Sequence, residues 1–306
     1  SSDTFTVTSE DGNWHKEYSV IIDTFDLPLR YDFEHYELNE TGKYQVFFEE
    51  TQGTALFKQY IWASGNSGFA LTGVGRNPQE YPTVSIENGI DGSRAIKLET
   101  KSTGQFGETV KMPIAAGNLF LGSFDVNNAV QKPLKATRFG LPFGKKPLQL
   151  KGYYKYTPGT QPFKAKDKNG NTVTIPGQED EGDIYAVLYE AAELDGKALD
   201  GNNVLTSENI VALARVEVEK KDEFTAFHVD FHYESRIPID WPKFIQDQRD
   251  PSDDGTAPYL SFSEEKMKNY EYNLAVVFTS SKYGAYFAGS VGSTLCIDKV
   301  EIVCEK

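Results

Sequence analysis

Apolar and polar residues alternate with a period of two through much of this sequence. In FTAFHVDFHYE, every second residue from Phe227 to Tyr233 is apolar and the residues between them are polar. Successive side chains of a β-strand point to opposite faces, so the pattern is typical of a half-buried strand. The same alternation predicts strands at 149–156, 183–192, 209–220, 271–280 and 294–303. Strands without interleaved helices predict an all-β fold, an antiparallel β-sandwich.

A helical signal is present only in SFSEEKMKNY (261–270), which offers a serine cap and acids for two turns at most. The first strands, within 5–23, flank a turn at 10–13 and precede a proline-marked break, DLPLR. Two strands cannot bury a core of their own, so they either add to the main sandwich or end an upstream domain. No linker follows Leu27, so we expect residues 28–306 to form one domain.

The charge of the chain narrows the choice of partners. Its 31 Lys and Arg against 45 Asp and Glu give a net charge of −14 over 306 residues, which repels phosphate backbones and anionic membranes. We therefore expect no nucleic-acid partner. No run of 18 apolar residues occurs, so membrane contact is expected only through a removed N-terminal lipid anchor. Cys296 and Cys304 are too far apart on one strand for a disulfide and are expected to be free thiols.

The stretch YIWASGNSGFALTG (60–73) places aromatic rings among small polar residues. Trp62 could serve as a stacking platform for a sugar ring, with Asn66 bonding to its hydroxyls. The alternative interpretation is a buried structural tryptophan before a glycine-rich turn. Other candidate ligand-binding residues are Tyr81, Tyr153, Trp241 and Lys282.

For two of these candidates, the neighbouring residues indicate whether the side chain is exposed. Tyr153 shares its parity with Lys151 and Lys155, so it is expected on the outer face of its strand, whereas Tyr154 and Tyr156 are expected in the core. Trp241 lies in IPIDWPKF, where flanking prolines stiffen the backbone and favour an exposed ring.

The sequence contains no strong metal-binding or catalytic motif. His228, Asp230 and His232 share one strand face, for which a solvated surface is a better interpretation than a metal site. Acidic loops at 177–183 and 246–255 do not match an EF-hand, and no Walker loop, HExxH or GxSxG occurs. We assign no catalytic residues; for a glycoside hydrolase using two carboxylates, the candidates include Glu190 and Asp230.

The order of three segments resembles that of carbohydrate-binding jelly rolls. These are YDFEHYEL (31–38), GIDGSRAIKLET (89–100) and GSTLCIDKVEIV (292–303). In such modules a Phe-Glu near the start meets an Ile-Asp in the last strand, and the acids often bind a structural calcium. The resemblance maps this site to Glu34 and Asp298; the alternative is two surface acids at strand ends. No other cofactor is expected.

Four longer motifs resemble the putative carbohydrate metabolism domain family of gut Bacteroidetes. They are WASGNSGFALTG (62–73), AAGNLFLGSF (115–124), RFGLPFGKKPLQLKGYYKYTPG (138–159) and VVFTSSKYGAYFAGSVGSTLCIDKVEIVCE (276–305). The resemblance implies a C-terminal β-jelly-roll preceded by an immunoglobulin-like domain, of which residues 1–27 would be the last hairpin. It also implies a carbohydrate role at the periplasm or outer-membrane surface, reached through a removed signal, and supplies no reaction.

Three functions remain open on the sequence. The leading hypothesis is a monomeric, non-catalytic glycan-binding protein of a polysaccharide-utilisation system, which holds a neutral oligosaccharide in a loop-lined pocket. The first alternative is a glycoside hydrolase. The second is a structural or adhesive surface protein whose jelly roll only presents loops. Turnover on polysaccharides distinguishes the first two, and an absence of glycan binding favours the third.

Overall fold

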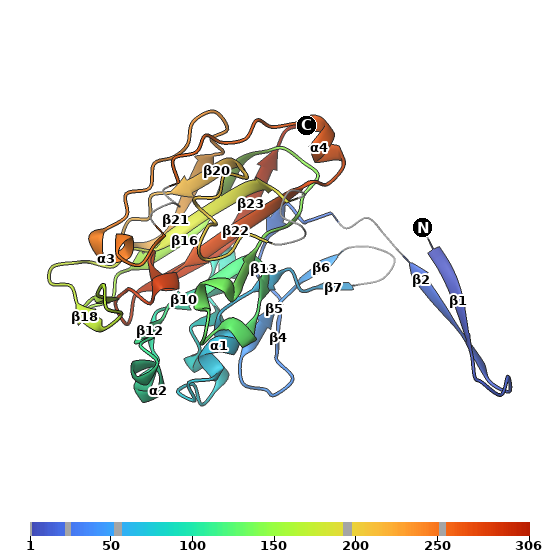
Figure 1. The fold of residues 1–306 in the computed structure, drawn as a ribbon, viewed down its shortest axis with the longest axis horizontal. Helices are drawn as coiled ribbons and strands as arrows, with labels where there is room; N and C mark the ends of the chain where they lie inside the picture. The colour runs from blue at the N-terminus through green and yellow to red at the C-terminus, as the bar shows by residue number, and fades with distance from the viewer. Residues whose placement is uncertain (1, 22–25, 52–56, 192–197, 251–254) are drawn as a thin grey trace.

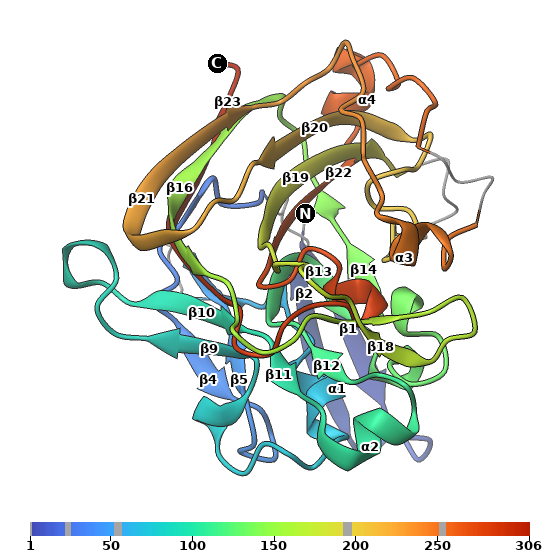
Figure 2. The ribbon, with the colours of Figure 1, turned by 90° about the vertical axis from the view of Figure 1, so that its left-hand side faces the viewer.

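The computed structural model describes residues 2–21, 26–51, 57–191, 198–250 and 255–306. Two antiparallel sheets face each other across a large apolar core, as Figure 2 shows from one end. The predicted fold class is confirmed: the chain is an all-β, antiparallel β-sandwich of jelly-roll type.

One layer is a six-stranded sheet. Its order is β21 (Lys221–Asp230), β16 (Pro147–Thr157), β23 (Thr294–Cys304), β10 (Ala95–Glu99) and β9 (Thr83–Ile86), with β3 (Arg30–Tyr31) pairing β23. Alternation holds here: Tyr154 and Tyr156 are buried while Tyr153 lies half-buried on the other face. Along β21 and just beyond it, His228, Asp230 and His232 are exposed, which agrees with a solvated face.

The other layer is a seven-stranded sheet. Its order is β14 (Thr137–Phe139), β13 (Asn118–Phe124), β22 (Tyr272–Thr279), β19 (Asp183–Glu190) and β20 (Ile210–Val216), with β15 (Leu141–Pro142) on β22 and β8 (Trp62–Ala63) on β13. Every residue of β19 is buried. Ile184 and Leu188 face the core between the sheets, whereas Val187 and Tyr189 belong to a second apolar cluster. This sheet is therefore covered on both faces, which strict alternation does not predict.

The cover on the second face comes from segments between the strands. Leu199, Leu205 and Tyr259 pack there with neighbouring side chains, and α3 (Lys243–Gln246) lies on the same side of the molecule (Figures 1 and 2). The predicted short helix is present as α4 (Glu264–Lys268), and the Ser263 hydroxyl accepts a hydrogen bond from the Lys266 N–H at its start.

The remaining elements are short. They are strands β1 (Ser2–Thr8), β2 (His15–Ile21), β4 (Tyr36–Leu38), β5 (Gln45–Phe47), β6 (Glu49–Thr51), β7 (Phe57–Gln59), β11 (Lys101–Ser102), β12 (Ile114–Ala115), β17 (Lys164–Lys166) and β18 (Thr172–Thr174), helices α1 (Asn66–Ala70) and α2 (Gly104–Thr109), and 3₁₀ turns η1 (Pro78–Glu80), η2 (Ile90–Gly92), η3 (Val126–Asn128), η4 (Pro133–Lys135) and η6 (Gly284–Tyr286).

The N-terminal strands β1 and β2 form the expected antiparallel hairpin. Its assignment to an upstream domain stays a prediction. Leu27, however, is 4% exposed and packs in the sandwich core, and Asp26 accepts a hydrogen bond from the Tyr270 hydroxyl. Asp26 and Leu27 therefore both contact the sandwich.

Two further expectations concern cysteine and membranes. Cys296 and Cys304 are free, as predicted, and burial raises the pKa of both thiols to about 11. Across the ranges that the structure describes, no helix has the length and apolar character to cross a membrane.

Candidate binding groove over the seven-stranded sheet

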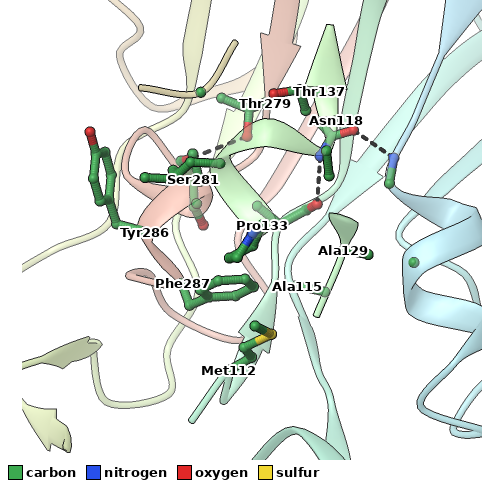
Figure 3. Close-up of a pocket in the computed structure, with 18 of the residues that line it drawn as sticks. Met112, Ala115, Asn118, Ala129, Pro133, Thr137, Thr279, Ser281, Tyr286 and Phe287 are labelled. Atoms are coloured by element: carbon green, nitrogen blue, oxygen red, sulfur yellow. Dashed lines mark hydrogen bonds between the residues drawn. The ribbon is translucent and has the colours of Figure 1, made fainter. Parts of the chain in front are cut away.

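A cavity of about 200 Å³ lies over the second face of the seven-stranded sheet, at the end that the apolar cover leaves open. Strands β13, β22 and β19 form its floor, and its walls come from α1, α2 and the segments 129–134 and 281–287. Figure 3 shows this space, with Met112, Ala115 and Phe287 close together on one side and Ala129 on another. We call this cavity the groove.

A row of polar side chains crosses the floor. Asn118 on β13 lies opposite Thr279 on β22, and Thr279 lies opposite Asp183 on β19. Directly opposed residues of neighbouring strands share a face and lie about 5 Å apart, so the row spans roughly 10 Å. Two residues further along, Phe120, Val277 and Tyr185 form an apolar row on the same face. The floor thus offers hydrogen-bonding groups beside apolar surface.

The polar row ends in a buried ion pair. Asp183 is 3% exposed and accepts hydrogen bonds from Nε and Nη2 of Arg215 at 2.9 and 2.7 Å. Burial alone would lower the pKa of Arg215, but the nearby Asp183 carboxylate raises it, so the guanidinium stays charged. The two opposite charges cancel, so the ion pair adds polar groups to the groove but no net charge.

Asn118 and Thr279 keep hydrogen-bonding capacity to spare. Oδ1 of Asn118 accepts from the Gly65 N–H at 2.8 Å, and its Nδ2 makes a long bond of 3.4 Å to the Ala116 carbonyl. The Thr279 hydroxyl donates to the Ser281 carbonyl at 3.1 Å (Figure 3). Within the described part of the chain, one amide hydrogen of Asn118 and the acceptor lone pairs of Thr279 have no hydrogen-bond partner, which suits the hydroxyls of a ligand.

Trp241 forms part of the wall. The Arg249 guanidinium lies 4.2 Å from the centre of the Trp241 ring, and the Tyr286 ring meets it edge-on at 6.3 Å. Within the described residues, Nε1 of Trp241 and Oγ1 of Thr137, another lining residue, are buried without a hydrogen-bond partner. Buried polar atoms are usually paired, so two such atoms bordering one cavity are unusual.

The wall segment 281–287 is fixed by a buried carboxylate beneath it. Oδ2 of Asp180 accepts hydrogen bonds from the Ser281 and Ser293 hydroxyls and from the Ser290 N–H, at 2.6, 2.7 and 2.8 Å. Burial raises the pKa of Asp180 to about 6, although these donors oppose the shift. Asp180 therefore ties both ends of the loop that carries Lys282 and Tyr286.

Two of the predicted ligand-binding residues line the groove: Trp241 and Lys282. Nζ of Lys282 is paired with Glu181 at 2.8 Å. Tyr153 lies elsewhere, half-buried on the outer face of the six-stranded sheet, and it is not among the lining residues.

The structure corrects the expectation for Trp62. Its side chain is 4% exposed, lies in the core between the sheets, and packs against Tyr31 and Phe33 at centroid distances of 5.0 and 5.4 Å. Its Nε1 donates to Glu49 at 2.8 Å. The ring is not accessible to a sugar, and the structural alternative accounts for it.

Asn66 and Tyr81 are also structural. Asn66 is fully buried, and its amide bonds to both the N–H and the carbonyl of Thr83, at 3.1 and 2.8 Å. Tyr81 is 1% exposed and packs against Phe69. With its main hydrogen-bonding capacity used on the backbone of β9, Asn66 has little to offer a ligand.

The proposed calcium ligands hold a loop. Oδ2 of Asp298 accepts from the Ile90 N–H and the Ser93 hydroxyl, at 2.7 and 2.8 Å, and Glu34 accepts from the Arg94 N–H at 3.0 Å. These donors occupy lone pairs that a calcium ion would need. The described residues contain no group of three or more His, Cys, Asp or Glu side chains that could hold a metal. Both acids anchor residues 90–94 through these bonds, which favours a structural role for them over calcium binding.

The two carboxylates considered for hydrolysis are separated. Glu190 is 4% exposed at the end of β19 and pairs with Lys266, whereas Asp230 lies on β21 of the other sheet and accepts from Gln149 at 2.6 Å. Neither lines the groove. The structure does not bring them together there.

Sequence reasoning missed Asn118, Thr279, Asp183 and Arg215. All four lie on strands that the alternation predicts or within the motifs quoted above, but each has an ordinary local context. They become a set only through strand pairing, and strand order cannot be read from any one segment.

Comparisons with known proteins agree with this architecture. The sequence profile of the family described as putative carbohydrate metabolism domain matches residues 32–303. A putative glycoside hydrolase from Bacteroides thetaiotaomicron VPI-5482 aligns with a TM-score of 0.75 at 42% identity, over 100% of this chain and 80% of that chain. One from Bacteroides vulgatus ATCC 8482 gives 0.74 at 36% identity, over 92% of this chain and 100% of that chain. No curated protein matches.

Proposed function

The chain belongs to the putative carbohydrate metabolism domain family, and on this basis we propose that it binds a neutral glycan in the groove, as a non-catalytic protein of a polysaccharide-utilisation system. Part of the same proposal is a monomer at the periplasm or outer-membrane surface, secreted through a removed signal. The observation that carries the proposal is the polar row of Asn118, Thr279 and Asp183 between aromatic walls.

A sugar ring suits such a floor. Its equatorial hydroxyls need donors and acceptors, and its C–H faces pack on aromatic rings. Asn118 supplies a donor, Thr279 an acceptor, and Trp241 an aromatic wall. These groups lie on strands or are held by packed rings, so little ordering is needed on binding.

Charge favours a neutral ligand. The chain carries a net charge of −14, and two groove cations, Arg215 and Lys282, are each paired with a carboxylate. A polyanion would meet an unfavourable field and would have to compete for these cations.

Hydrolysis has weaker support. The two solved relatives are each described as a putative glycoside hydrolase. Glycoside hydrolysis ordinarily uses two carboxylates on either side of the scissile bond. Among the described residues that line the groove, Asp183 is the only acid, and both its oxygens are bonded to Arg215. The groove therefore supports binding better than bond cleavage.

A glycan array on the purified chain, followed by calorimetry, tests the proposal. We expect Thr279→Val to weaken the best neutral glycan by about two- to tenfold, the effect of one lost hydrogen bond. Thr157→Val, at an exposed position of β16, is the matched control and should bind as wild type does. An array without a neutral ligand, or equal affinity of both variants, would overturn the assignment.

Turnover is measured separately. Reducing ends released from array-positive polysaccharides should stay at the level of the protein-free blank. If they rise with wild type and fall with Asp183→Asn, the protein is a hydrolase and the non-catalytic assignment is wrong.

A further inference from the structure

The lining of the groove changes from charged to apolar across the seven-stranded sheet. Of its charged lining residues, Asp183 and Arg215 lie on β19 and β20. Lys282, after β22, pairs with Glu181 just before β19, and Arg249, after α3, bonds to Asn202 and Thr206 before β20. Beyond β13 and β14, at the opposite end of the same sheet, the lining described by the structure is uncharged. That end is built from Phe69, Phe106, Val110, Met112, Phe124, Ala129, Val130 and Phe287. We call it the apolar end.

Exposed apolar side chains continue from the apolar end onto the surface. Phe106 and Val130, both lining residues, are 41% and 36% exposed, and Val126, Leu71 and Val74 nearby are 38%, 48% and 41% exposed. The segments are in contact: a Cβ at Gly104 would lie 3.0 Å from Val74, and one at Gly68 would lie 3.5 Å from Ala129. Apolar side chains exposed together are typical of a binding surface.

A plain sugar does not account for this end. Its hydroxyls would face Met112, Ala115 and Phe287, which surround the lower part of the cavity in Figure 3. The lining hydroxyls of Thr72 and Thr103 already donate to the carbonyls of Phe69 and Met112. An occupant that satisfies both ends is polar on the side of Asp183 and Arg215 and apolar on the side of α1 and α2.

We propose that the ligand is a glycan with an apolar substituent, of the acyl or aryl kind, whose sugar lies on the polar row while the substituent fills the apolar end. This inference rests on the proposed function and narrows its ligand class. The sugar and its substituent share the cavity of about 200 Å³, so the substituent is expected to be a small group. Filling it should raise affinity about fourfold for each methylene buried.

The apolar end is tested first without a sugar. N-phenyl-1-naphthylamine, a neutral apolar fluorophore, should bind wild type with increased emission. Ala129→Phe, which fills the cavity, and Val130→Asp, which charges its exposed rim, should each lower that binding at least tenfold. Val7→Asp is the matched control, because Val7 is 51% exposed on the N-terminal hairpin. No emission change, or equal binding by all variants, would overturn the inference.

The link to the sugar is tested by direct titration. The affinities of methyl, butyl, hexyl and octyl β-D-glucosides, below micelle-forming concentrations, are measured by calorimetry for wild type and for Ala129→Phe. Wild type should show affinity rising with chain length up to the size of the cavity, and Ala129→Phe should show no such rise. The same rise in both proteins would overturn the inference.

The two proposals fail differently. Glycan binding on the array without fluorophore binding would support the proposed function and contradict the inference of an apolar substituent. Fluorophore binding by a protein that binds no array glycan and no glucoside would overturn the proposed function and, with it, the glycan ligand.

Discussion

Asp183 and Arg215 form a two-bond ion pair in the floor of the groove, with both carboxylate oxygens engaged by the guanidinium. The Asp183 side chain is buried, and the Arg215 side chain is partly buried, at 14% exposed. Removing one partner leaves the other as an uncompensated buried charge. The pair is therefore a stability element as well as part of the candidate site.

We expect Asp183→Ala to lower the free energy of unfolding by about 3–5 kcal/mol, measured in urea. The double variant Asp183→Ala with Arg215→Met should recover most of this loss, because no charge remains buried. Glu301→Ala breaks the pair with Arg30, which is 77% exposed, and should cost less than about 1 kcal/mol. Equal losses at both sites would contradict this role.

The pH dependence of stability should contain a contribution from Asp180. Its pKa is raised by burial from 3.8 to about 6 in the folded state, so the folded state binds the proton more tightly than the unfolded chain does. The stabilisation is complete below about pH 3.8 and is lost as the pH rises through about 6. A shift of about two units corresponds to about 3 kcal/mol.

Urea unfolding of wild type and Asp180→Asn at pH 4 to 7 measures this effect. The difference in unfolding free energy between the two proteins should fall by up to about 3 kcal/mol over that range. Because the variant also loses hydrogen bonds, the slope with pH is the readout and the absolute stability is not. Parallel curves would show that Asp180 does not titrate here.

Trp62 and Trp241 should respond differently to substitution. Trp62→Ala opens a cavity in the core and should cost about 3–5 kcal/mol, whereas Trp62→Phe should stay folded with unchanged glycan affinity. Trp241→Ala should weaken glycan binding by roughly two- to tenfold while the fold persists. Calorimetry on variants with a native circular dichroism spectrum measures both glycan affinities. Weaker glycan binding by folded Trp62→Phe would show that Trp62 takes part in binding.

Asp298 should act without calcium. We expect an unchanged melting temperature in chelator or added calcium, since the donors around Asp298 already occupy its oxygens. Asp298→Ala should lower the free energy of unfolding by at least about 2 kcal/mol, because three donors lose their acceptor. A melting temperature that falls in chelator for wild type, and not for Asp298→Ala, would restore the calcium site.

The alternation of apolar and polar residues in the sequence determined where the main strands lie. β16, β19, β20, β22 and β23 begin and end within a few residues of the predicted runs, because side-chain alternation is a local property of an extended chain. The serine-capped helix at 264–268 is local in the same sense. The parity of Tyr153 against Tyr154 also followed from the sequence alone.

Tertiary structure decided which polar residues meet. Asn118, Thr279 and Asp183 are up to 161 positions apart in the numbering, and only the order β13, β22, β19 places them in one row. Likewise, the composition around Trp62 and Asn66 suits a sugar site or a core equally well. Burial between two sheets settles this choice, because the surroundings of a side chain are set by whichever distant segments pack on it.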